Sequence, residues 1–311
     1  MRNNPSRAAT AVIVALDPDP KIFLDLLHAI APQVTGVVVV DNSADRNRIA
    51  SLLRDHSLDQ CVLIANGRNV GLAAAQNTGI DHALRAGAAY ILLLDHDSVP
   101  APDMVEQLAE ALESVVQTGE KCAAAGPAYV EEQSQSESRF VQIGRLGMRR
   151  VRCDIAAPVK VRADLLIASG MLIPAQALRE IGMMDETLFV DHVDTDWCWR
   201  AREKGYRMVG VCGAKLSHRL GDRPARSFAG RRFFIRSPAR HYFFFRNSVL
   251  LYRRAYSPMV WKIGDALRLL PLAVAALIFC TPRMRHMRAI ARGVLDGLRG
   301  RSGPLPPALE P

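Results

Sequence analysis

The strongest constraint on the fold is an alternation, over the first 130 residues, between short apolar runs and longer stretches with helical periodicity. The run at 36–41 is apolar up to Asp41, as in a strand that is covered on both faces of a sheet. Such alternation predicts an α/β fold whose central sheet is mostly parallel, with helices on both faces. Strands are expected at 11–16, 36–41, 61–65, 90–95 and 122–126, and helices from residue 21, at 72–86 and at 104–116.

The rest of the chain is less regular. Residues 131–157 are polar and then basic, which predicts a mobile surface excursion, and the tail at 303–311 is expected to be frayed. We divide the chain into a catalytic domain at 1–255 and a basic, apolar helical segment at 256–311. Within the domain, a ligand-binding half is expected at about 8–130 and a second half at about 158–255.

The charge distribution and the cysteine spacing indicate the kind of partner and the redox environment of the protein. From residue 219 to the end there are 18 Lys and Arg against 4 Asp and Glu, whereas residues 1–218 carry 22 against 27. The basic last third therefore indicates an anionic partner, such as a lipid surface or nucleic acid. The six cysteines are scattered without a CxxC pair, which argues against a disulfide framework or a zinc–cysteine site and suits a reducing cytosol.

Two acidic clusters are candidates for chemistry. Asp95 and Asp97 follow an apolar strand, where two carboxylates can converge on one Mg²⁺ or Mn²⁺ ion that also binds a substrate phosphate. Asp191, Asp194 and Asp196 lie beside aromatic residues at the start of a basic helix. One of them could act as a general base, although turn formation and helix capping also favour aspartate at such places.

The glycine-containing stretch at 69–80 has small residues every second or third position, which allow a helix to pack closely on a sheet. It lacks the Lys-Ser/Thr of a P-loop and the GxGxxG pattern. ATP hydrolysis and dinucleotide binding of those kinds therefore lose support.

Taken in order, these motifs resemble those of family 2 glycosyltransferases with the GT-A fold. The motifs are DN at 41–42, RNVGLAAAQNTGI at 68–80, LLLDHDSVP at 92–100, LFVDHVDTDWCWRA at 188–201 and HRLGD at 218–222. They are most similar to the bacterial rhamnosyltransferase branch, which uses dTDP-L-rhamnose. Each motif alone is weak, but their common order makes the resemblance specific.

The resemblance implies a role for individual residues. Asp41 would bind the pyrimidine ring of the donor, and Asp95 and Asp97 would form the DxD pair, with Asp97 as the direct metal ligand. Asp194 would be the catalytic base, although Val193 replaces the glutamate that usually precedes it, which leaves Asp191 and Asp196 as alternatives. Further donor-side or acceptor-side contacts, and a third metal ligand at His218, are implied for Asn42, Arg68, Asn69, Gly71, Asp191, Asp196, Trp197, Arg246, Asn247 and His218.

The implied reaction is an inverting transfer of L-rhamnose from dTDP-L-rhamnose to a hydroxyl group of a lipid-linked glycan or glycolipid. A transferase of the same fold that uses a UDP- or GDP-sugar remains an alternative. A nucleotidyltransferase is disfavoured because no glycine-rich, lysine-bearing motif accompanies the first strand. A basic nucleic-acid-binding module is the remote alternative, and we expect no nucleic acid partner because no recognition motif accompanies the arginines.

The uncharged run at 269–282 is too short to span a bilayer comfortably, which takes about 20 residues. With arginine-rich flanks, it favours peripheral contact with the cytoplasmic face of the inner membrane. A buried helix that closes the domain, or a dimer contact, is the alternative.

Overall fold

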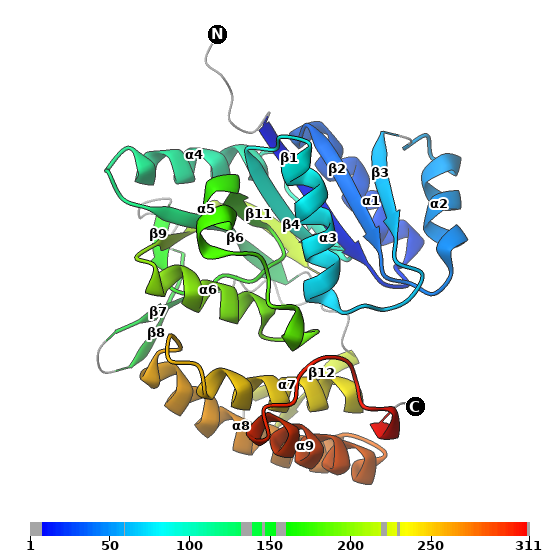
Figure 1. Cartoon of the computed structure of the whole chain (residues 1–311), viewed down its shortest axis with the longest axis vertical. Helices are drawn as coiled ribbons and strands as arrows, with labels where there is room; N and C mark the ends of the chain where they lie inside the picture. Colours follow the sequence, from blue (N-terminus) through cyan, green and yellow to red (C-terminus); the bar gives the residue numbers. More distant parts are fainter. Residues whose placement is uncertain are drawn as a thin grey trace.

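The computed structural model describes residues 8–58, 60–131, 139–144, 147–153, 160–218, 223–228 and 231–309 (Figure 1). Within these ranges, nine strands form one sheet in the order β3-β2-β1-β4-β10-β6-β11-β5, with β9 paired to β11. The strands are β1 (Ala9–Ala15), β2 (Gly36–Asp41), β3 (Cys61–Ala65), β4 (Tyr90–Asp95), β5 (Ser98–Pro100), β6 (Cys122–Glu131), β9 (Lys160–Ala163), β10 (Met171–Pro174) and β11 (Arg207–His218).

The sheet is mixed rather than uniformly parallel. Strand β1 pairs in parallel with β2 and β4, and β2 with β3, as the alternating pattern predicts. The short strand β10 enters antiparallel between β4 and β6, and β5 and β9 run antiparallel to β11. The α/β expectation is therefore confirmed, with a parallel core extended by antiparallel strands.

Helices cover both faces of the sheet (Figure 1). Side chains that point to one face pack with α3, α5 and α6, and those on the opposite face pack with α1, α2 and α4. The bounds are α1 (Pro20–Ile30), α2 (Arg46–Asp55), α3 (Leu72–Arg85), α4 (Met104–Val116), α5 (Ala175–Ile181) and α6 (Val193–Glu203), with single 3₁₀ turns at Ala31–Gln33, Glu186–Leu188 and Pro307–Leu309.

Local chemistry explains two of these helices. The side chain of Asp19 accepts hydrogen bonds from the backbone N–H groups of Lys21 and Ile22, and Pro20 supplies the fixed φ of a first helical residue. In α3, a β-carbon at Gly79 would lie 2.3 Å from Val12 Cγ1, so only glycine lets this helix approach β1 so closely. The prediction that small residues serve close packing is confirmed here.

The last helices form a separate layer below the sheet in Figure 1. They are α7 (Pro238–Tyr252), α8 (Met259–Phe279) and α9 (Arg283–Leu298), preceded by the hairpin of β12 (Arg223–Phe228) and β13 (Arg231–Ile235). Helix α7 packs along both α8 and α9. In the part of the chain that the structure describes, no helix combines the length and apolar character that crossing a bilayer requires.

Three expectations from the sequence are wrong. Part of 131–157 is an ordered hairpin of β7 (Phe140–Ile143) and β8 (Met148–Val151), with Phe140 buried against Gly210, while residues 132–138, 145–146 and 154–157 lie outside the described ranges. A disulfide joins Cys153 to Cys212, because β11 comes close to the segment after β8, although 59 residues separate them. Residues 303–309 of the tail are not frayed, because the N–H of Gly303 donates to the carbonyl of Thr187 at 2.8 Å.

Candidate active site

The two predicted donor-side carboxylates lie on either side of one strand end. In the sheet register, Asp41 of β2 is opposite Ala15 and Asp95 of β4 is opposite Val14, both on β1. Two strand spacings separate the aspartates, which is about 10 Å. Strand β2 pairs with one edge of β1, and the later strand β4 pairs with the other edge, so the strand order reverses at β1. Such a switch point is where α/β sheets bind ligands. A nucleoside diphosphate can extend across this edge.

Asp41 has an unused acceptor. The carboxylate is fully buried, and its Oδ1 accepts a hydrogen bond from the N–H of Ser43 at 2.8 Å. Among the described residues, none donates a hydrogen bond to Oδ2. Because a buried acceptor without a partner is costly, this oxygen is suited to a donor group of a ligand.

A loop at 66–71 is fastened beside Asp41 by Asn42. The Asn42 amide donates to Asn69 Oδ1 at 3.1 Å, and its oxygen accepts from the N–H of Val70 at 3.2 Å. Gly71 has a φ of +92°, and a β-carbon there would lie 2.7 Å from the ring of Phe189. The structure therefore gives Asn42, Asn69 and Gly71 a role in shaping the loop, and it leaves Arg68 exposed on it.

Asp95 ends β4 and Asp97 lies in the turn before β5, and both are partly exposed. The backbone at Asp95 is fixed, because its N–H donates to Ser169 Oγ at 3.1 Å, and that hydroxyl donates to Ser98 Oγ at 2.9 Å. At the end of β11, the backbone of His218 is paired with Ser98, next to Asp97. The side chain of His218 lies outside the described part of the structure.

The residues in this turn fit a divalent cation. Burial raises the pKa values of Tyr129 and Asp194, and the negative charge of the neighbouring Asp95 raises both further. Carboxylate oxygens are the ligands that Mg²⁺ and Mn²⁺ prefer, so the donor set of Asp95 and Asp97 suits a divalent cation.

The three aspartates before and within α6 have different surroundings. Asp191 accepts two hydrogen bonds from Arg240, at 2.8 and 3.0 Å. Asp196 is fully buried and forms ion pairs with Arg200 at 2.9 Å and with Arg254 at 2.5 Å. Asp194 forms no ion pair within the described ranges, which distinguishes it from the other two.

Asp194 lines a partly open cleft of about 200 Å³. Its carboxylate accepts hydrogen bonds from the N–H groups of Thr195, at 2.7 Å, and Ala168, at 3.4 Å. Burial, with a smaller contribution from Asp95, nevertheless raises the pKa of Asp194 to about 6. A carboxylate with such a pKa is a stronger base than an exposed aspartate and is still mostly ionised at pH 7.

The backbone that leads into α6 is strained. Phe189, Asp191 and His192 all have φ values between +61° and +66°, which costs about 1–3 kcal/mol at each non-glycine residue. Arg246 and Asn247 of α7 hold this segment, since both donate to the carbonyl of Leu188 at 2.9 Å. Asn247 also donates to the carbonyls of Val190, at 2.7 Å, and Asp191, at 2.9 Å.

The predicted residues thus divide into two groups. Asp41, Asp95 and Asp97 lie at or just beyond the carboxyl ends of β2 and β4, and Asp194 lines the cleft. Asp196, Trp197, Arg246 and Asn247 are each fully buried and make contacts within the protein, so the structure does not bring them to the cleft. For Trp197, the indole N–H donates to the carbonyl of Gly182 at 2.9 Å.

Sequence reasoning missed Ser169 and Tyr129. Ser169 accepts a hydrogen bond from the N–H of Asp95, and Tyr129, which lines the cleft, donates through its hydroxyl to the carbonyl of Ser169. Burial, followed by the charges of Asp95 and Asp194, holds the pKa of Tyr129 well above its usual value. The pair Ser169–Gly170 directly before the apolar strand at 171–174 was the only local indication, and it differs from Asp41 and Asp95, which end their strands.

Comparisons with known proteins show the family and the fold of this chain. A family model described as "Glycosyl transferase family 2" matches residues 11–146. The chain is similar to the dTDP-rhamnosyl transferase RfbF of Shigella flexneri, with 30% identity over 298 residues that cover 94% of this chain and 96% of that protein.

Two solved structures share the fold. A structure of GalNAc-T7 with UDP, GalNAc and Mn²⁺ matches with a TM-score of 0.60 and 12% identity, over 96% of this chain and 57% of the other. The mannosyltransferase PcManGT from Pyrobaculum calidifontis, in complex with GDP-Man and Mn²⁺, matches with a TM-score of 0.55 and 14% identity, over 95% and 88%. The chain thus spans little more than half of GalNAc-T7, and the likeness concerns the α/β GT-A fold. On the strength of the full-length relative, the chain is a nucleotide-sugar glycosyltransferase and belongs to glycosyltransferase family 2.

Proposed function

We propose that this protein transfers L-rhamnose from dTDP-L-rhamnose to an acceptor hydroxyl with inversion at the anomeric carbon. The name of the full-length relative supports the donor. The observation that carries the reaction is Asp194, whose carboxylate faces the cleft, lacks the arginine partners of Asp191 and Asp196, and has a pKa raised to about 6.

The donor would lie across the strand ends of β2, β1 and β4. The buried Oδ2 of Asp41 would accept a hydrogen bond from the N3–H of thymine. Asp95 and Asp97, with His218, would hold Mg²⁺ or Mn²⁺. When bound, the metal ion supplies positive charge at the diphosphate, which leaves as dTDP.

Asp194 would act as the general base. Its carboxylate takes the proton of the acceptor hydroxyl as the acceptor oxygen forms a bond to the anomeric carbon and the bond between that carbon and the dTDP oxygen breaks. The partly enclosed cleft beside Tyr129 would position the acceptor on the face of the sugar opposite the diphosphate. One displacement of this kind inverts the anomeric configuration.

A UDP- or GDP-sugar is the alternative donor, because uracil also carries an N3–H group. The test is to incubate the protein and Mg²⁺ or Mn²⁺ with a panel of dTDP-, UDP- and GDP-sugars and to measure donor binding by calorimetry. We expect dTDP-L-rhamnose to bind at least about tenfold more tightly than the other donors, which corresponds to ~1.4 kcal/mol. Equal or tighter binding of another donor would refute the assignment of rhamnose.

We further propose that the acceptor has a lipid anchor, as a lipid-linked glycan or glycolipid does, and that α8 lies on an anionic membrane surface. Six large apolar side chains are exposed along one side of α8 at helical spacing, with exposures from 46% at Ile278 to 72% at Leu267. The stripe is about 30 Å long. It contains Met259, Ile263, Leu267, Leu270, Val274 and Ile278.

The start of α9 adds exposed cations to the C-terminal helical layer. Arg283, Arg285 and Arg288 are exposed and alternate with the exposed Met284 and Met287. Apolar side chains beside arginines are typical of an interfacial helix on anionic lipid. The charge distribution therefore favours a membrane surface over a second copy of this chain.

Vesicle sedimentation tests this proposal. The variant Leu267→Ser/Leu270→Ser removes two exposed side chains, and we expect roughly 30-fold weaker binding to phosphatidylglycerol vesicles, from ~1 kcal/mol per side chain. The control Val62→Ser/Val116→Ser removes apolar side chains exposed on β3 and α4 and should bind as the wild type does. Equal binding of all three proteins, or a dimer that the Leu267→Ser/Leu270→Ser variant dissociates, would contradict it.

A further inference from the structure

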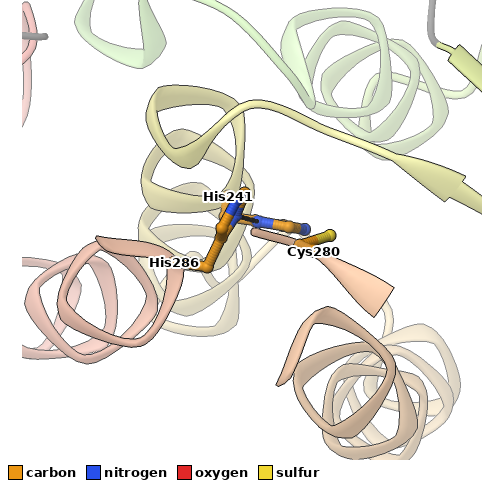
Figure 2. Close-up of side chains that lie close together, drawn as sticks. All are labelled: His241, Cys280 and His286. Atoms are coloured by element: carbon orange, nitrogen blue, oxygen red, sulfur yellow. Dashed lines mark hydrogen bonds between the residues drawn. The ribbon is translucent and has the colours of Figure 1, made fainter. Parts of the chain in front are cut away.

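A second group of metal-binding side chains lies in the C-terminal helical layer, on different elements from the aspartate pair. His241 is in the first turn of α7, Cys280 directly follows α8, and His286 is in the first turn of α9. Figure 2 shows the three side chains converging from these three elements. One ligand atom from each residue can be chosen so that all three lie within 4.8 Å of one another.

The group is buried. The exposed fractions are 6% for His241, 3% for Cys280 and 3% for His286. The Nδ1 atoms of the two imidazoles face each other at 2.9 Å, and the backbone at Thr281 hydrogen-bonds to His286. Burial favours the neutral imidazole, which keeps a lone pair for a ligand. A second hydrogen bond that orients the ring is typical of histidines that bind metals.

We propose that His241, Cys280 and His286 bind a zinc ion that ties the three C-terminal helices together. Two imidazoles and one thiolate are borderline-soft ligands, which Zn²⁺ accepts and which hard ions such as Mg²⁺ and Mn²⁺ do not favour. On binding, the Cys280 thiol releases its proton to solvent, the sulfur bonds to the metal, and water fills the fourth position.

The distances allow this with small movements. In a tetrahedral zinc site the nitrogen and sulfur ligands lie roughly 3.3–3.6 Å from one another, as follows from bond lengths of about 2.0–2.3 Å. The imidazole nitrogens are already at 2.9 Å, and the longest separation in the group is within 4.8 Å. A contraction of about 1 Å along that edge is within reach of side-chain rotation.

The competing arrangement is a plain hydrogen bond between the two imidazoles beside a neutral thiol. In that arrangement one Nδ1 carries a hydrogen and points it at the other, so neither nitrogen is available to a metal. The arrangement also leaves the buried thiol without any part in the contact. The two possibilities differ in a measurable property, which is metal binding through sulfur.

A zinc ion here would act on the candidate active site through α7. His241 directly follows Arg240, which holds Asp191, and the same helix carries Arg246 and Asn247, which hold the strained segment before α6. The ion is therefore expected to stabilise the conformation of that segment rather than to contact a substrate.

Titration of the metal-free full-length protein with Co²⁺ tests the proposal. A cobalt ion bound by a thiolate gives a ligand-to-metal charge-transfer absorption in the near ultraviolet, which oxygen ligands such as Asp95 and Asp97 do not give. We expect this band to saturate at one equivalent of the thiolate-bound ion and to disappear on addition of Zn²⁺. Absence of the band in the folded wild-type protein would overturn the proposal, and this measurement depends on no variant.

Variants locate the site. Cys280→Ser should abolish the band and weaken Zn²⁺ binding by at least about 100-fold, since changes at residues that only support a ligand already cost 10–100-fold. Cys61→Ser is the matched control, because Cys61 is another buried free cysteine. It should keep the band, as should Asp97→Ala, which separates this site from the proposed donor site. A band that persists in Cys280→Ser would overturn the assignment.

Discussion

Replacement of Asp194 by asparagine tests both the chemistry and the energetics of the site. Burial of the carboxylate raises its pKa from 3.8 to about 6. A shift of about two units corresponds to ~3 kcal/mol by which the folded state disfavours the ionised form. Asp194→Asn removes the charge and keeps the shape. We therefore expect a variant that is inactive in transfer and, at neutral pH, more stable than the wild-type protein.

The difference in stability between Asp194→Asn and the wild type should depend on pH. Above pH 6 the carboxylate is ionised in both the folded and the unfolded chain, so the full penalty of ~3 kcal/mol applies to the wild type. As the pH falls from about 6 towards 3.8, the folded state takes up the proton first and the penalty disappears. The stability advantage of Asp194→Asn over the wild type should thus be larger at pH 7.5 than at pH 4 by ~2.4 kcal/mol.

Thermal unfolding of both proteins across this pH range, without donor or metal, is the measurement. For a chain of this size we expect the difference in Tm to change by on the order of 5 °C. Parallel pH profiles would refute the assignment of the raised pKa to Asp194. The control is Asp196→Asn, which disrupts two buried ion pairs and should instead lower stability by ~3 kcal/mol.

Three further predictions concern the donor side. Asp41→Asn should raise the KM for the donor by roughly 10–100-fold, the value of a hydrogen bond to a charged group, with kcat nearly unchanged, and steady-state kinetics would show it. Asp97→Ala should remove the dependence of donor binding on Mg²⁺ or Mn²⁺, and calorimetry that still finds this dependence would exclude the metal role. Gly71→Ala should destabilise the protein by ~3 kcal/mol, because its β-carbon would lie 2.7 Å from Phe189 at a φ of +92°. Gly87→Ala, at a φ of +83° in open space, should cost only ~1 kcal/mol, and thermal unfolding distinguishes the two.

The parallel half of the fold could be predicted because its elements are defined by local patterns. The apolar residues that define β2 are close together in the sequence, and so are the small residues that define α3. The antiparallel entry of β10 between β4 and β6 could not, because four residues carry no information about a partner far away in the chain. The same is true of Cys153 and Cys212, whose pairing depends on the path between them.

The site shows the same division. The sequence places Asp41 and Asp95 at strand ends, and the sheet then brings them to one edge. The sequence alone leaves Asp191, Asp194 and Asp196 as alternatives for the base. They differ in whether an arginine pairs with the carboxylate, and most of these arginines come from other elements. Arg240 neutralises the first, and Arg200 and Arg254 neutralise the third. Only the folded chain reveals that Asp194 is the carboxylate without such a partner among the described residues.

The way in which the segment before α6 is held has a consequence for the order of events during synthesis. Its left-handed backbone depends on hydrogen bonds from Arg246, Asn247 and Gly303, all of which leave the ribosome after it. The strands that carry Asp41 and Asp95 have their partners much earlier. A nascent chain would therefore complete its nucleotide-binding edge first, and the position of Asp194 would be fixed only when the last helix has emerged and docked.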